Sequence, residues 1–198
     1  MKRLAIFFII FMSICFQSYA IEPYRDDNIG VTFPSKLAGF NLVNNHMYEK
    51  DGCGGCGYSL RYQDESLFKA DIYVYDSNFD DIGSGISSQR VSDEFKNILG
   101  VFPYLEGKGK YKNVEELEKG NKSYGTKRIE FLWAMFQYEQ SPGEGVLYHG
   151  IRISNAYLTS KQGKFIKVRI TFKKSELEKR QNEIGIFMNE LSNLLGGF

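Results

Sequence analysis

Apolar and polar residues alternate with a period of two through the middle of the chain, and this pattern most limits what the chain can fold into. Residues 68–75 place Phe, Ala, Ile and Val on one face and Lys, Asp and Tyr on the other, which predicts a half-buried strand. Residues 58–63 alternate in the same way. A glycine-rich segment, 51–57, separates this strand from an earlier one around 40–49, so the two are predicted to form a hairpin.

The second half of the chain predicts longer strands. Residues 128–138 are apolar or aromatic on both faces, which favours a strand in the centre of a sheet. After a turn at 141–145, strands over 146–158 and 164–172 are predicted to pair across the connection 159–163, whose glycine suits a hairpin loop. In the last strand one set of side chains is predicted to point inward and a second set outward; the outward set is Lys167, Arg169 and Thr171.

Two segments change to the helical period of 3.6. Ser87 or Ser88 can cap a first helix, which is predicted to end at Gly100. Residues 175–178 match a capping box that opens a second amphipathic helix, with Glu183 on its exposed face. The apolar stripe of this second helix comprises Ile184, Phe187, Met188, Leu191 and Leu195.

The order of these elements predicts the fold class. Consecutive strands joined by short turns give a mainly antiparallel sheet. Helices after the first and second groups of strands can then pack on it, which predicts an α+β fold, an α/β/α-type sandwich. Residues 21–198 are long enough for a single domain with its own hydrophobic core.

The N-terminal residues 1–20 are typical of a signal peptide. Lys2 and Arg3 precede an apolar run over 4–16, and residues 18–20 (Ser-Tyr-Ala) fit a cleavage site before Ile21. A lipoprotein is the alternative, because Cys15 lies in the apolar run, but the preceding Ile is larger than the residue normally found there. The sequence therefore predicts a periplasmic or secreted protein with no transmembrane span in the mature chain.

The composition excludes two classes of protein. Lys and Arg number 25 against 24 Asp and Glu, so the chain lacks the basic excess that nucleic-acid binding requires. Phe and Tyr number 16 and 13, which is more aromatic bulk than a disordered chain carries. A folded protein that does not bind nucleic acid is predicted.

The most specific local feature is the C-x-x-C pair Cys53 and Cys56. In an exported protein the pair favours a structural disulfide at the tip of the predicted hairpin. A redox-active pair is the alternative, but such pairs lower a thiol pKa at a helix N-terminus, and here a strand pattern follows. Removal of residues 1–20 would leave only one intramolecular pairing of cysteines.

Other chemistries are weakly supported by the sequence. Metal binding at the cysteine pair would need further ligands from His46 and His149, which lack zinc-site spacing. Residues 76–83 resemble a calcium loop but lack the glycine and glutamate that such loops require. The carboxylates at 115, 116 and 118 and the serine in 83–85 match no hydrolase motif. No catalytic residue, cofactor or metal is therefore predicted.

One resemblance adds to this interpretation. The strand over 164–172 with the amphipathic helix 175–195, and the segment 28–34 as an opening strand, resemble the PsbP-like fold, which is also found in bacterial secreted proteins of the DcrB group. The resemblance implies a non-catalytic binding or assembly factor, acting on an unidentified envelope protein or small ligand. The alternative function is a periplasmic thiol-disulfide oxidoreductase that uses Cys53 and Cys56.

Overall fold

The structure is a computed structural model that describes residues 21–65, 68–140 and 150–196. The predicted signal peptide with Cys15, the predicted turn 141–145, the first residues of the predicted strand 146–158, and His149 lie outside the described residues.

The described residues form two sheets, of two and eight strands, and two α-helices. The larger sheet has the order β3-β4-β5-β6-β10-β9-β8-β7, and every neighbouring pair is antiparallel. In chain order the elements are β1 (Tyr24–Asp26), β2 (Val31–Phe33), β3 (Lys36–Leu37), β4 (Phe40–Met47), a 3-10 turn (Tyr48–Asp51), β5 (Tyr58–Gln63), β6 (Lys69–Tyr75), α1 (Gln89–Gly107), β7 (Tyr111–Tyr124), β8 (Ile129–Gln140), β9 (Ile151–Lys161), β10 (Lys164–Lys173), a 3-10 turn (Lys174–Glu176) and α2 (Leu177–Gly196).

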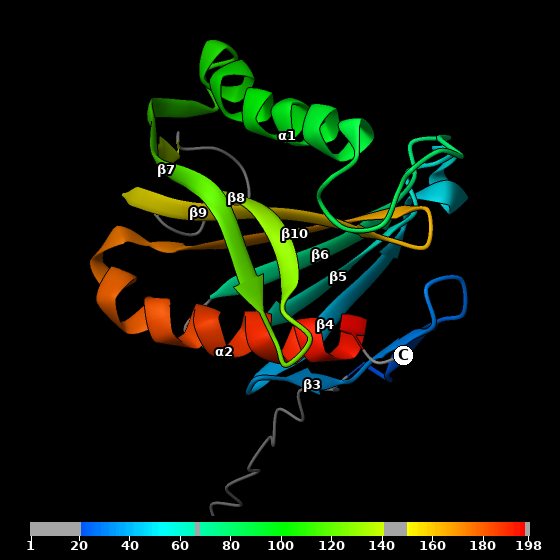
Figure 1. Cartoon of the computed structure of the whole chain (residues 1–198). Coiled ribbons are helices and arrows are strands. Elements are labelled where there is room, and N and C mark those ends of the chain that lie inside the picture. Colours follow the sequence, from blue (N-terminus) through cyan, green and yellow to red (C-terminus); the bar gives the residue numbers. More distant parts are fainter. Residues whose placement is uncertain (1–20, 66–67, 141–149, 197–198) are drawn as a thin grey trace, which may run out of the picture.

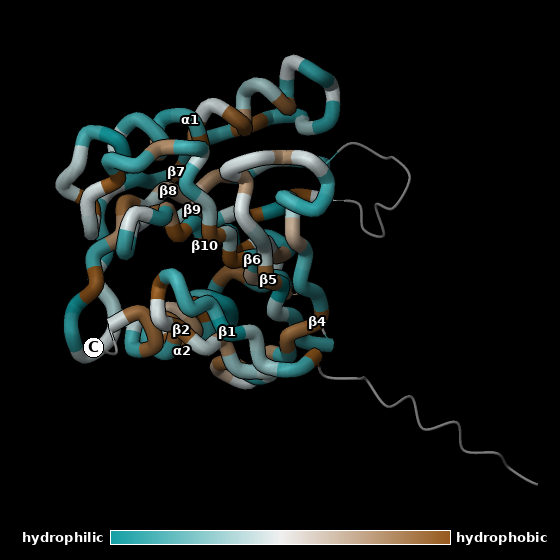
Figure 2. The backbone as a smooth tube through the Cα atoms, turned by 90° about the vertical axis from the view of Figure 1, so that its right-hand side faces the viewer, coloured by the Kyte–Doolittle hydropathy of each residue, from teal (hydrophilic) through white to brown (hydrophobic). Residues whose placement is uncertain are grey.

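The two helices lie on opposite faces of the larger sheet (Figure 1), which confirms the predicted α+β fold. Two apolar clusters fill the spaces between the layers. One joins α2 and the β1–β2 hairpin to one face of the sheet, and the other joins α1 to the opposite face. The hydrophobic parts of the backbone tube accordingly gather where the sheet lies between the helices (Figure 2).

The alternating segments form the predicted strands. In β5 and β6 the buried and partly exposed side chains alternate strictly, and the buried set faces α2. β8 is flanked by strands on both sides, as its two apolar faces predict. The connection between β9 and β10 is shorter than predicted: only Gln162 and Gly163 lie between the strands, both with positive φ, as a tight hairpin requires.

The sequence did not predict β7. This edge strand is exposed along most of its length, and Glu115, Glu116 and Glu118 lie on it. Its charged side chains hide the alternation that marks a half-buried strand, while its backbone still pairs with β8. The charges also keep an exposed edge from pairing with other chains.

The predicted end of the first helix at Gly100 is wrong. Ser88 caps α1 as predicted, its hydroxyl accepting a hydrogen bond from the Val91 amide at 3.2 Å, but the helix continues to Gly107 and includes Pro103. The apolar stripe explains the extension, because Phe102 stacks on Phe136 with ring centroids 3.9 Å apart. This burial offsets the local cost of glycine and proline in a helix interior.

The second helix is confirmed, but its first turns differ from the prediction. A 3-10 turn, Lys174–Glu176, precedes it, so Ser175 lies inside this turn instead of capping α2. The Glu176 carboxylate accepts a hydrogen bond from Arg180 at 3.0 Å. Arg180 is fully buried and also forms ion pairs with Asp64 and Glu183. The prediction of Glu183 as a simple surface residue is therefore wrong, since it helps to neutralise a buried cation.

Phe187 should carry a large part of the packing of α2. Its ring is fully buried and meets Phe40 and Tyr62 edge-on, with centroids 5.9 and 5.8 Å away. Phe187→Ala should lower the free energy of unfolding by about 3–5 kcal/mol, because it leaves a cavity. Asn182→Ala, at an exposed position of the same helix, should change it by less than about 0.5 kcal/mol. Urea denaturation measures both; equal losses would contradict the helical phase.

Candidate functional site

The disulfide loop is the first candidate. β4 ends at Met47, two residues before its predicted end, and a 3-10 turn leads into the loop. Cys53 and Cys56 are disulfide-bonded, with Cα atoms 5.5 Å apart. Cys53 is exposed and Cys56 is half-buried. The bond closes the tip of the β4–β5 hairpin, where the sequence places it.

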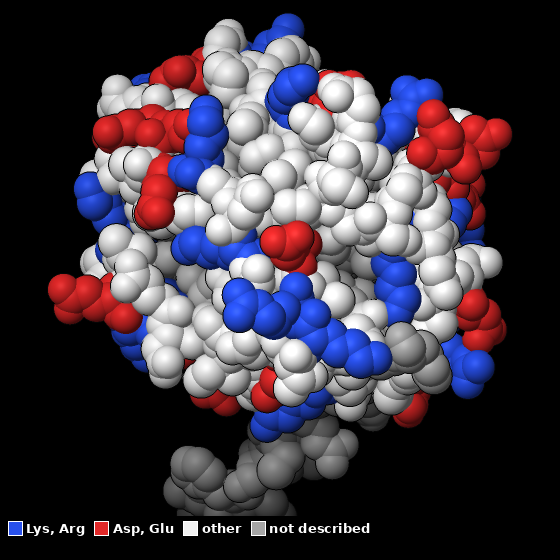
Figure 3. Space-filling model, viewed as in Figure 1, with Lys and Arg blue, Asp and Glu red and all other residues white. Residues whose placement is uncertain are grey.

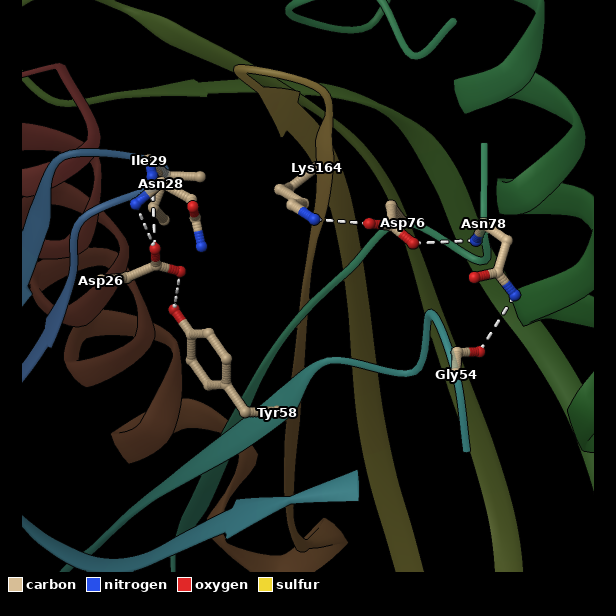
Figure 4. A network of polar contacts seen from close by, with 8 residues as sticks. All are labelled: Asp26, Asn28, Ile29, Gly54, Tyr58, Asp76, Asn78 and Lys164. Carbon is tan, nitrogen blue, oxygen red and sulfur yellow. Dashed lines mark hydrogen bonds and ion pairs between the residues drawn. The ribbon is translucent and has the colours of Figure 1, made fainter. Parts of the chain in front are cut away.

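Hydrogen bonds fasten this loop to the segment that follows β6. The Gly55 carbonyl accepts from the amides of Asp76 and Ser77 at 3.3 and 2.8 Å. The Asn78 side-chain amide donates to the Gly54 carbonyl at 3.1 Å, and its backbone amide donates to Asp76 at 2.8 Å. Lys164 of β10 forms an ion pair with the same carboxylate (Figure 4). The loop before β5 is thus linked by polar contacts to the segment after β6 and, through Asp76, to β10.

At two positions of the loop only glycine fits. A Cβ on Gly55 would lie 2.5 Å from the Asn78 amide nitrogen, and one on Gly57 would lie 1.9 Å from the Val74 carbonyl oxygen. Both residues also have positive φ, of 74° and 58°. The close backbone approach that they permit holds the disulfide loop against β6.

The setting of the cysteine pair differs from that of an activated thiol. The described residues on its two sides form a 3-10 turn and β5, so no α-helix N-terminus points at either sulfur. Peptide dipoles at such a terminus are the usual means of stabilising a thiolate.

The other sequence candidates do not converge on a metal. The imidazole of His46 lies 2.8 Å from the Asp51 carboxylate rather than on the cysteines. In the calcium-like segment Asp76 pairs with Lys164, and Asp81 pairs with Arg90 at 2.9 Å. Within the described ranges no group of three His, Cys, Asp or Glu could hold a metal ion.

A second candidate is a surface that the sequence predicted only in part, on the side of the sheet that α1 covers incompletely. We call it the basic sheet face; it comprises Arg61, Lys69, Asp71, Tyr73, Lys167 and Arg169. The strand register brings them together: Asp71 lies opposite both Arg61 and Arg169, and Tyr73 lies opposite Lys167. Lys69 precedes Asp71 by two residues and therefore shares its side of the sheet.

The acidic groups near this face already have partners. Arg61 donates to Asp71 at 2.6 Å, and Glu94 of α1 accepts a hydrogen bond from the Tyr75 hydroxyl at 2.6 Å. Arg169 donates to two tyrosine hydroxyls, those of Tyr111 at 2.9 Å and Tyr138 at 3.2 Å. The positive charge on the face therefore exceeds the negative charge that is available to neutralise it.

Both lysines of this face have lowered pKa values. Burial lowers the pKa of Lys167; Glu94 and Asp71 oppose this effect, and Arg169 adds to it by less than Glu94 opposes it. Burial and Arg61 lower the pKa of Lys69 in the same way, as does Arg152. Both groups are partly desolvated cations beside other cations.

The surroundings of Lys167 are aromatic and partly hollow. Its ammonium lies 4.1 Å from the centroid of Tyr73, and burial raises the pKa of that phenol to about 12, so the hydroxyl stays a hydrogen-bond donor. A cavity of about 170 Å³ opens between α1 and β10. It is lined by Lys167 and Arg169 and, from α1, by Glu94 together with apolar side chains such as Ile98.

The sequence predicted part of this surface. Alternation placed Lys167 and Arg169 on the outward side of their strand, and it placed Lys69 and Asp71 outward on another. It could not show that β6 and β10 are neighbours, because 88 residues separate Asp76 from Lys164 at their joined ends. The available signal is the presence of basic residues on the polar sides of three alternating strands, the third being residues 58–63 with Arg61.

Comparison with protein-family models and with curated proteins gave no match to the chain. No helix of the described residues is long and apolar enough to cross a membrane. Function is therefore inferred from the geometry of the chain itself.

The lowered pKa of Lys167 predicts a pH dependence of stability. Between that pKa and the unfolded value near 10.4, unfolding takes up a proton, so the free energy of unfolding rises with pH. Lys167→Met should be more stable than wild type at pH 7, and its advantage should shrink as pH rises toward about 10.4.

Urea denaturation at several pH values measures this difference. Lys179→Met removes an exposed lysine of α2 and serves as the matched control. An advantage of Lys167→Met that stays constant over the whole pH range would contradict the assignment.

Proposed function

We propose that the protein is an exported, non-catalytic binding or assembly factor of the periplasm or cell envelope, and that an acidic surface of a partner protein docks on the basic sheet face. The observation that carries the proposal is the strand register, which places Lys69, Lys167 and two arginines on one face around the carboxylate of Asp71. An incoming carboxylate would form ion pairs with these partly desolvated cations, which gives the face its complementarity to acidic groups.

The dimensions of the face favour a protein partner. The adjoining cavity of about 170 Å³ is smaller than the roughly 300–1,000 Å³ of typical small-molecule pockets. The surface around it presents arginine and tyrosine side chains, the residue types that dominate binding energy in protein interfaces. The resemblance to the PsbP-like fold supports the same role, since that fold is associated with accessory and assembly proteins.

Two features of the sequence support export. Residues 1–20 have the basic, apolar and small-residue regions of a signal peptide in the correct order. The Cys53–Cys56 disulfide suits the oxidising compartment to which such a signal leads.

Binding of an acidic peptide tests the docking surface. Octaglutamate should bind the purified protein with an affinity that falls as salt rises, whereas octaglutamine should not bind. The double variant Lys69→Gln, Lys167→Gln should weaken binding at least tenfold, because it removes two of the cations. Isothermal titration calorimetry measures each affinity.

The double variant Lys174→Gln, Lys179→Gln is the control, since it removes two exposed lysines beside and on α2. It should bind octaglutamate like wild type. In affinity capture from an envelope extract, a true partner should be retained by wild type and by this control but lost from the variant of the basic sheet face. Equal weakening by both double variants would overturn the docking proposal.

We further propose that the disulfide is structural rather than redox-active. The double variant Cys53→Ser, Cys56→Ser should fold and lose about 2 kcal/mol or less, because the bond closes a short loop that hydrogen bonds already fasten. It should keep the binding of octaglutamate. After reduction of the wild type, maleimide titration should give ordinary thiol pKa values, above about 8.

An intact-mass measurement of the exported wild type provides the reference. The mass should correspond to a chain that begins at Ile21 and lacks the two thiol hydrogens of an open pair. A thiol pKa well below 7, with insulin-reductase activity that the double variant lacks, would instead favour the oxidoreductase.

A further inference from the structure

A cavity of about 350 Å³ lies at the end of the sheet where the β7–β8 turn, the β9–β10 hairpin and the last turn of α2 meet. We call it the end cavity. It is separate from the basic sheet face in its lining residues, and its volume falls within the range of small-molecule sites.

Side chains of α2 position one rim of the end cavity. The Asn189 carboxamide accepts a hydrogen bond from the Gly125 amide at 2.9 Å, and that of Asn193 accepts one from the Thr126 amide at 2.8 Å. These contacts fix the β7–β8 turn, so that the next two residues, Lys127 and Arg128, line the cavity. In Figure 3 basic side chains gather over this turn and α2.

The interior of the end cavity is apolar. Ile129, Ile166 and Leu195 line it, and the last two are buried in the hydrophobic core. Such a lining excludes a fully hydrated ion and favours an apolar group.

One buried hydroxyl in the lining lacks a partner. Thr159 is 2% exposed, and its Oγ1 accepts and donates no hydrogen bond among the described residues. The next residue behaves differently: the Ser160 hydroxyl lies 2.8 Å from the Gly85 carbonyl oxygen and also reaches that of Gly83. Since a buried unsatisfied hydroxyl is costly, the Thr159 side chain is suited to receive a polar atom of a ligand.

The charges around the cavity are mainly positive. Lys127, Arg128 and Lys161 line it together with one carboxylate, that of Glu130. The Lys161 ammonium donates to the Leu195 carbonyl, and burial together with Lys127 lowers its pKa. An anionic group at this rim would meet three cations and a single acid.

The backbone of Arg128 provides a further indication. This residue has φ of 52°, a left-handed conformation that glycine or asparagine adopts more easily. Arginine at this position contributes to the lining of the cavity, although its left-handed conformation lowers the stability of the turn.

We propose that the end cavity binds a small amphiphilic anion, an aliphatic chain with a carboxylate or phosphate head group. The chain lies against Ile166 and Leu195, and the head group lies at the cationic rim within reach of the Thr159 hydroxyl. This site goes beyond the proposed docking function, because its residues and its ligand class are different.

Isothermal titration calorimetry of the full exported protein, with ligands whose aliphatic chains have equal length, tests the proposal. Decanoate and decyl phosphate represent the two possible head groups, and whichever binds tighter identifies the source. Decanol and decyltrimethylammonium, which keep the chain but lose or reverse the charge, should bind at least tenfold more weakly. Acetate and inorganic phosphate, which lack the chain, should be weaker by a similar factor.

Two variants separate binding from folding. Arg128→Gly should weaken decanoate binding at least tenfold while the unfolding midpoint stays the same or rises, because glycine accepts the left-handed conformation. Thr159→Val should raise the midpoint of the ligand-free protein and also weaken binding, because it removes the unpartnered hydroxyl. Lys174→Gln, Lys179→Gln, away from the cavity, is the control and should leave binding unchanged.

The proposal is overturned if neither anion binds at millimolar concentration, or if decanol binds as tightly as the anions. It is also overturned if Arg128→Gly binds decanoate like wild type. None of these results depends on octaglutamate binding, so failure at the end cavity is distinguishable from failure at the basic sheet face.

Discussion

A helix is too narrow to cover a wide sheet, and this mismatch shapes the whole molecule. Strands lie about 4.8 Å apart, so the larger sheet is roughly 34 Å wide, whereas a helix with its side chains is about 10–12 Å across. On one face α2 shares the covering with the β1–β2 hairpin, and the core there is continuous. On the other face α1 packs mainly near β7 and β9, so the strands beyond it are left in contact with solvent. The basic sheet face occupies that remaining area.

The tip of the β4–β5 hairpin illustrates how the covered and uncovered regions are tied together. At the start of β5 the Tyr58 hydroxyl donates to Asp26, which also accepts the amides of Asn28 and Ile29, joining β5 to the β1–β2 hairpin (Figure 4). In the adjoining disulfide loop, the glycine carbonyls accept hydrogen bonds from the segment after β6. None of these contacts involves a sulfur atom, so they rather than the disulfide should hold this hairpin in place.

The sequence predicts elements whose burial is periodic and misses those whose stability comes from elsewhere. The strict alternation in β5 and β6 and the stripe of α2 were predicted because each buries one face. β7 was missed because it is held by backbone pairing with β8 and not by the burial of one face. α1 was cut short because Phe102 packs on a strand 34 residues further along the chain. The same limit applies to the sites: the cysteine pair is local and was found, while Lys69 and Lys167 share one face of the sheet only through strand order, opposite Thr171 and Tyr73 respectively.

At the two proposed sites, features that cost stability coincide with groups of cations. Arg180 is fully buried, yet three carboxylates neutralise it, so its burial serves the attachment of α2. Lys167 and Lys69, in contrast, are desolvated next to other cations, Arg128 holds an unfavourable φ, and the Thr159 hydroxyl has no partner among the described residues. Each of these features costs stability and none improves packing. Similar departures occur singly elsewhere, such as the positive φ of Ala38 and the unpartnered hydroxyl of Ser192. At the two surfaces they coincide with grouped cations, which is what selection for binding would leave.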